Sequence, residues 1–193
     1  MNIDIEKLHK TADNHHSATM AVIDWIIGRN YKPIVSPIIV KKAEQVFLII
    51  DGSNNEKPKE VDSFDAYITL ASFSLELKLK LLLAIENEFK KGHNLSSLYD
   101  NLSNDSKIYI QNKVDEITQT SEKYNEISKK INDDLGIKFS WNVKDLISNS
   151  SNAFNKWRYH FEVNSNADLT WFAGYSELQK AIDSRIAQLQ PIS

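Results

Sequence analysis

Ser74-Leu-Glu-Leu-Lys-Leu-Lys-Leu-Leu-Leu83 is the most apolar stretch of this 193-residue chain, and it decides the fold class. At about 100° per residue, its leucines spread around most of a helical circumference. Such a pattern predicts a central helix over residues 64–91 that is contacted on several sides. Gly92 follows as a helix-stopping residue, and Asn94 follows as an N-cap for a short helix.

Elsewhere the apolar residues recur at spacings of three and four, and we find no sustained alternation typical of strands. This spacing predicts an all-α fold, an antiparallel helical bundle with additional N-terminal and C-terminal helices. We expect one domain over residues 1–193, with the pair of helices within 3–50 packed on the rest. The expected helices are 3–28, 37–50 opened by Pro37, 106–135, 141–147 resuming over 153–163, and a last helix capped by Asp168 that ends near Leu189.

The composition excludes several classes of site. No cysteine is present, so disulfides, cysteine-ligated zinc, iron–sulfur clusters and thiol catalysis are all excluded. The formal charge is −3, so a contact with nucleic acid needs a local basic patch, and there is no strong signal for DNA binding. We find no signal peptide, membrane span or cofactor motif, and we therefore expect a cytoplasmic protein without a cofactor.

Four charged residues interrupt the apolar surface of two helices. Glu76 and Lys80 lie side by side on the central helix, while Arg158 and Glu162 share one shoulder of the helix around Trp157. We hypothesise a cross-helix network in which Arg158 meets Glu76 and Glu162 meets Lys80. In the non-functional alternatives, such a network does no more than fix the helix register, or each ion pair is exposed to solvent. The functional alternative is that Arg158, Lys80 or His93 faces a groove and binds a phosphate or an acidic group.

The central helix, the Gly92-His93-Asn94-Leu95 turn and Arg158-Tyr159 with Glu162 together resemble the HEPN-like helical domain of prokaryotes. The resemblance covers residues 64–164, about half of the chain. It implies a helical core and a bacterial protein that commonly forms a homodimer. It also implies binding of RNA, a nucleotide or a partner protein, in a defence or toxin–antitoxin setting.

Members of that family that cleave RNA carry an arginine followed after four to six residues by a histidine. Arg158 is instead followed at those positions by Val163, Asn164 and Ser165, and His160 lies only two residues after it. The departure favours a non-catalytic or catalytically lapsed binding module. The alternative is a metal-independent RNase with an altered active site built from Arg158, His160 and His93.

A second constellation lies on the first predicted helix. His9, Asp13 and His16 share one face at i, i+4 and i+7, which is a partial pattern for a metal site. Ligands from another helix would still be needed, and the three residues span about 10 Å at 1.5 Å per residue. A solvated polar face is therefore the favoured interpretation. A purely structural interaction protein is the third functional alternative.

Overall fold

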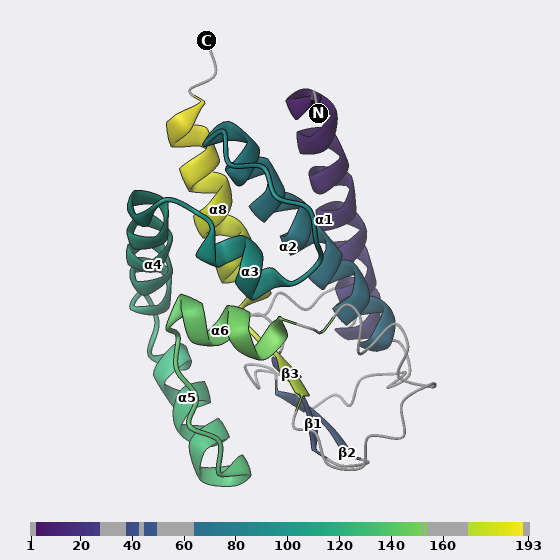
Figure 1. Ribbon diagram of the computed structural model, residues 1–193. Coiled ribbons are helices and arrows are strands. Elements are labelled where there is room, and N and C mark those ends of the chain that lie inside the picture. The colour runs from purple at the N-terminus through teal and green to yellow at the C-terminus, as the bar shows by residue number, and fades with distance from the viewer. Residues whose placement is uncertain are drawn as a thin grey trace.

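The computed structural model describes residues 3–27, 38–42, 45–49, 64–151, 153 and 170–190. In this described part, seven helices pack together beside one small sheet (Figure 1). The helical part of the sequence prediction is thus confirmed. The helices are α1 (Ile5–Ile27), α2 (Phe64–Ile85), α3 (Leu95–Asp100), α4 (Asn104–Thr118), α5 (Glu122–Leu135), α6 (Val143–Ser150) and α8 (Tyr175–Leu189), and the strands are β1 (Ile38–Lys42), β2 (Gln45–Ile49) and β3 (Thr170–Phe172).

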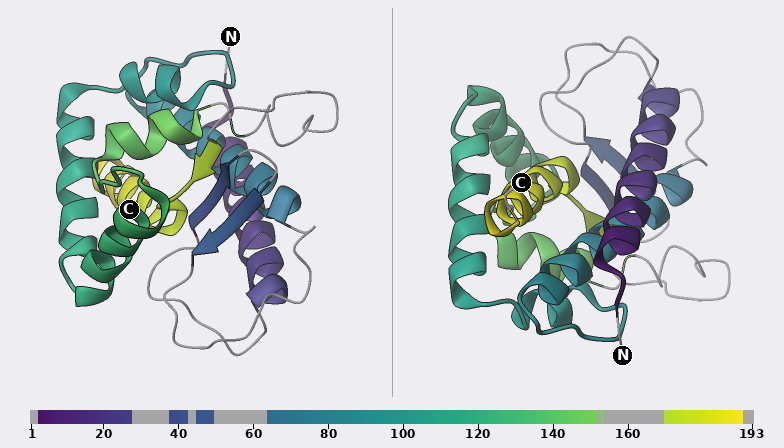
Figure 2. Two further views of the ribbon diagram at one scale, coloured as in Figure 1. Left: turned by 90° about the horizontal axis from the view of Figure 1, so that it is seen from below. Right: turned by 90° about the horizontal axis from the view of Figure 1, so that it is seen from above.

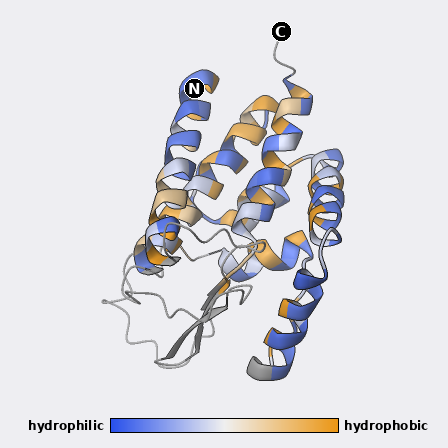
Figure 3. Ribbon diagram, turned by 180° about the vertical axis from the view of Figure 1, so that it is seen from behind, coloured by the Kyte–Doolittle hydropathy of each residue, from blue (hydrophilic) through white to orange (hydrophobic). Residues whose placement is uncertain are grey.

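Helix α2 is central, as the leucine pattern predicts. It lies between α1 and α8, with α1 antiparallel to it, and α3 crosses its face (Figure 1). Six of its leucines are buried, on several sides of the helix. Hydrophobic segments, coloured orange, recur along both α2 and α8 when the molecule is seen from behind (Figure 3). The buried leucines are Leu75, Leu77, Leu79, Leu81, Leu82 and Leu83.

The central helix ends at Ile85, six residues before the predicted end. Asn87 adopts a left-handed conformation with φ 63°, which asparagine tolerates better than most residues. The Asn87 N–H then donates to the Ala84 carbonyl, and the Glu88 N–H donates to the Leu83 carbonyl. These two bonds satisfy carbonyls at the helix end and form a Schellman motif.

The predicted helix over 37–50 is wrong, because the structure forms a hairpin there. Strands β1 and β2 pair antiparallel with Ile38 opposite Ile49, and β3 pairs with the other edge of β1. The apolar runs are short and rich in β-branched residues, which fit a pleated surface better than a helix. The prediction that the chain forms no strands is therefore wrong. The sheet lies below α6 and beside α1 (Figures 1 and 2).

The predicted helix over 106–135 is two helices. Helix α4 ends at Thr118, and Ser121 becomes the N-cap of α5 by accepting a hydrogen bond from the Lys123 N–H. Thr118 and Thr120 donate to nearby backbone carbonyls, and such bonds compete with helix continuation. A cluster of hydroxyl residues thus breaks a pattern whose apolar spacing continues across the break.

The start of the last helix also differs from the prediction. Helix α8 begins at Tyr175 with Gly174 as its N-cap, after strand β3, rather than at a cap on Asp168. Other predicted boundaries are confirmed, since α1 matches 3–28 and Asn94 caps α3 by accepting from the Ser97 N–H at 2.8 Å. Helix α6 overlaps the predicted 141–147, whereas the predicted helix over 153–163 lies, apart from residue 153, outside the described residues.

Candidate functional site

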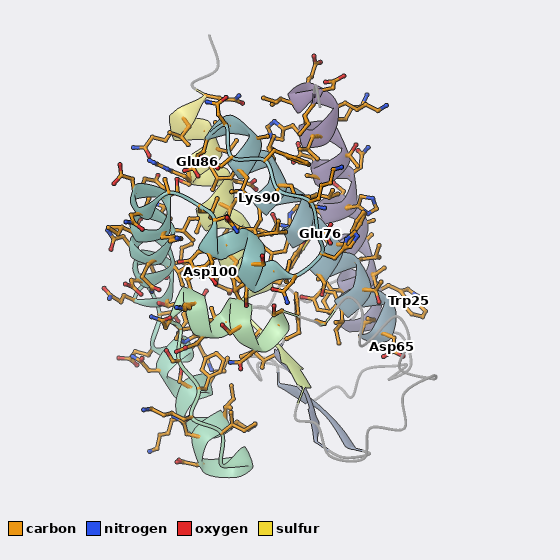
Figure 4. All side chains as sticks on the ribbon, viewed as in Figure 1. Trp25, Asp65, Glu76, Glu86, Lys90 and Asp100 are labelled. Atoms are coloured by element: carbon orange, nitrogen blue, oxygen red, sulfur yellow. The ribbon has the colours of Figure 1, made fainter. Side chains whose placement is uncertain are left out.

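Three of the sequence-predicted residues meet beside the central helix, and we call Glu76, Lys80 and His93 the Glu76 cluster. The Glu76 side chain on α2 is 1% exposed, and Lys80 donates to its Oε1 across 2.7 Å from one turn further along. His93 Nδ1 lies 3.0 Å from Glu76 Oε1 and 3.1 Å from Oε2. Figure 4 shows Glu76 on α2, behind the segment that leads to α3.

The loop between α2 and α3 brings His93 to the carboxylate. The left-handed Asn87 turns the chain at the end of α2, and Gly92 has φ 117°, a conformation that favours glycine. Asn94 then fixes the start of α3 directly after the histidine. His93 is 58% exposed and Lys80 is 14% exposed, so the Glu76 cluster extends from the core to the surface.

The other two residues of the predicted network, Arg158 and Glu162, lie outside the described residues, so their pairs with Glu76 and Lys80 stay a prediction. His160, a candidate of the RNase alternative, lies outside them as well. Exposed Lys90 and Lys91 lie in the same loop as His93. Lys90 projects near the crossing of α2 and α3 (Figure 4).

Sequence reasoning missed a second charged cluster on the opposite side of α2. Lys78 is 2% exposed, and its amine donates to Asp13 Oδ1 of α1 across 2.6 Å. The same amine lies 2.6 Å from Asp183 Oδ1 of α8, an ion pair whose angle lies outside hydrogen-bond geometry. We call Lys78, Asp13 and Asp183 the Lys78 junction. The sequence does contain a signal for this junction. A lysine on a helix that is apolar on all sides must be buried, and a buried lysine must be paired.

The first-helix constellation does not converge on one point. His9 Nε2 lies 3.6 Å from Asp13 Oδ2, but Asp13 also pairs with Lys78. His16 turns toward α8, where its Nδ1 lies 2.8 Å from the Tyr175 hydroxyl. No group of three histidine or acidic side chains in the described part of the chain is arranged to hold a metal ion.

His16 belongs to a polar seam between α1, α2 and α8. Gln179 donates to the Ser74 hydroxyl at 2.8 Å and to the Tyr175 hydroxyl at 3.3 Å. Burial lowers the pKa of His16 below its ordinary value of 6.5, and Lys78 adds to this effect against the opposing carboxylates of the junction. The neutral imidazole is therefore the form that suits this interface.

Glu86 joins α2 to α4. Its carboxylate accepts from the Ser103 N–H at 3.0 Å and from the Ser103 hydroxyl at 2.6 Å, and it also accepts from Ser106. Partial burial raises the pKa of Glu86, but these hydrogen bonds and the charge of Arg185 outweigh it and lower the pKa below 4.5. Arg185 donates to the Ser106 hydroxyl and lies over the Tyr109 ring, so this arginine holds α8 to α4.

Comparisons with known proteins find no family model, no curated protein and no solved structure that matches this chain. Among the described residues, no helix is both long enough and apolar enough to cross a membrane.

Proposed function

We propose that this chain is a non-catalytic, HEPN-like helical module that binds RNA or a nucleotide through an anionic group at the Glu76 cluster. The observation that carries the proposal is the pair of basic side chains, Lys80 and His93, held by one buried carboxylate. A basic side chain that is already held in place by a buried carboxylate suits the binding of a phosphate, because the side chain loses little conformational freedom when the phosphate binds.

The local charge supports this location. The whole chain has a formal charge of −3, so general attraction of nucleic acid is absent and a local basic patch has to supply it. Lys90 and Lys91 are exposed and occupy the same loop as His93. The loop between α2 and α3 therefore carries two exposed lysines within three residues of His93.

The test is binding of fluorescent single-stranded RNA and of ATP to the purified protein, measured by fluorescence anisotropy and calorimetry at low salt. Lys80→Gln is expected to weaken binding about tenfold, the equivalent of one hydrogen bond to a charged group. Lys129→Gln on α5 is the matched control, since Lys129 is exposed and lies on another helix. Equal affinities for wild type and Lys80→Gln would place binding elsewhere and contradict the proposal.

A second candidate, the metal-independent RNase, is favoured by one observation. Glu76 contacts His93 in the way that a carboxylate contacts a histidine that acts as a general base in many enzymes. Cleavage of a mixed RNA pool in EDTA, with Arg158→Ala and His93→Ala alongside, separates the candidates. Cleavage by wild type that both variants lose would replace the binding module with the enzyme.

The proposal extends to self-association and to a bacterial defence or toxin–antitoxin setting, because the resembled family commonly has both. Sedimentation equilibrium of the full chain tests the homodimer directly. A monomer at all concentrations measured would remove this part of the proposal and leave the binding site untouched. Capture of one protein partner in place of RNA or a nucleotide would redirect the binding proposal toward that partner.

A further inference from the structure

The geometry between His93 and Glu76 restricts which ring nitrogen carries the proton. His93 Nδ1 lies between the two carboxylate oxygens, at 3.0 and 3.1 Å. Lys80 donates to Oε1, so that oxygen acts as an acceptor. An ionised carboxylate only accepts hydrogen bonds, and Nδ1 must then be the donor in this contact.

We propose that Glu76 is a positioning residue that fixes His93 as its Nδ1–H tautomer and sets the orientation of the ring. The neutral ring then has Nε2 as its acceptor nitrogen. Free histidine in water favours the opposite tautomer, with the proton on Nε2, so the assignment is a measurable departure from the default. For ligand binding the inference rests on the proposed function, but the tautomer is a property of the protein alone.

The anchor is suited to this role because it is buried. Glu76 is 1% exposed on the central helix, and leucines flank it on both sides in the sequence. His93 is attached to a loop and is 58% exposed, so Glu76 is by far the more buried partner of the contact. A buried carboxylate against an exposed ring makes Glu76 the residue that positions and His93 the residue that is positioned.

The first experiment measures the tautomer of His93 by long-range nitrogen–proton correlation NMR, at a pH where the histidine rings are neutral. His93→Asn identifies the resonance among the five histidines of the chain. We expect the proton on Nδ1 in wild type and a shift toward Nε2–H in Glu76→Gln. Wild-type protein with the proton mainly on Nε2 would overturn the inference.

Lys78→Met is the matched control for general destabilisation. Lys78 is as deeply buried on the same helix, but it points to the opposite side, toward α1 and α8. We expect its His93 signal to keep the wild-type tautomer. A tautomer change of equal size in Lys78→Met and Glu76→Gln would show that loosening of α2 is the cause, and the positioning role would be wrong.

The second experiment uses the fluorescent single-stranded RNA as the probe. In the neutral Nδ1–H form, Nε2 accepts hydrogen bonds, so His93 suits a hydroxyl or amine donor of the RNA while Lys80 contacts its phosphate. Losing the ring position weakens this contact, whereas removing the Glu76 charge attracts the anion more strongly, so the two effects have opposite signs. We expect Glu76→Gln to bind about tenfold more weakly than wild type. Tighter binding would show that Glu76 acts only through its charge. If wild type does not bind the probe, the proposed function fails, and the NMR result still decides the tautomer.

Discussion

Lys78→Met tests whether the Lys78 junction holds three helices together. The buried amine contacts Asp13 of α1 and Asp183 of α8, each at 2.6 Å. Methionine keeps the length of the apolar stem and removes only the charge and the donors. We therefore expect the variant to fold and to lose stability through the two ion pairs.

The magnitude follows from the exposure of each partner. A hydrogen bond to a charged group contributes about 1.5–3 kcal/mol when buried, and an exposed pair contributes about 0–1 kcal/mol. Lys78 is 2% exposed, but Asp13 and Asp183 are 56% and 44% exposed and can be rehydrated after the substitution. An intermediate value of about 1 kcal/mol for each pair gives a loss of about 2 kcal/mol.

The assay is urea and thermal unfolding followed by circular dichroism. A loss of about 2 kcal/mol lowers the Tm of a domain of this size by about 4–8 °C. A double-mutant cycle with Asp183→Asn should give a coupling energy of about 1 kcal/mol. The matched control is Lys123→Met, which removes an exposed pair with Glu126 at 3.3 Å and should cost less than about 0.5 kcal/mol.

The result that refutes this reasoning is a free energy of unfolding for Lys78→Met within about 0.5 kcal/mol of wild type. A coupling energy near zero would have the same meaning for Asp183. Either outcome would show that hydration of the two carboxylates compensates for the lost amine.

Three further variants test other parts of the fold. Glu86→Gln should lower the free energy of unfolding at pH 7, measured in urea titrations, by about 1 kcal/mol, as for a lost helix cap. Because the folded pKa of Glu86 is lowered, its contribution to stability is present above pH 4.5 and is lost as the pH falls through the folded pKa. The variant should therefore lose less stability than wild type on acidification. His16→Asn should remove part of the stability loss that occurs below pH 6.5. Because the folded pKa of His16 is lowered, the contribution of its neutral ring to stability is complete above pH 6.5 and is lost on acidification. A pH profile of Tm that is the same in wild type and variant would contradict this. Gly174→Ala should cost more than Gly136→Ala, since both glycines have positive φ but only the Cβ at 174 would lie 2.9 Å from Leu146; equal Tm losses would show that Leu146 moves freely aside.

The helices could be predicted where periodicity and caps agree. Leucine spacing located α2, and Asn94 located the start of α3. The hairpin of β1 and β2 could not be separated from a helix in this way, because its apolar runs are short and Pro37 suits a helix start as well. The break at Ser121 was missed because apolar spacing carries no information about hydroxyl groups that bond to the backbone.

The candidate site could be predicted in part. The i, i+4 spacing placed Glu76 beside Lys80, and the structure has this pair at 2.7 Å. The approach of His93 depends on the left-handed conformation of Asn87 and on the φ of Gly92, which spacing along a helix does not encode. Lys78 was overlooked because its partners, Asp13 and Asp183, lie far away in the sequence.

The two charged clusters on α2 have a consequence for folding specificity. Glu76 and Lys78 are two residues apart, so their side chains leave the helix about 200° from each other. A helix with leucine on nearly every side has many rotations about its axis that bury similar apolar area. In this protein, any rotation other than the observed one carries a carboxylate or an amine away from its partners and into hydrocarbon. The charges thus select one orientation of α2 among alternatives that its leucines alone would leave close in energy.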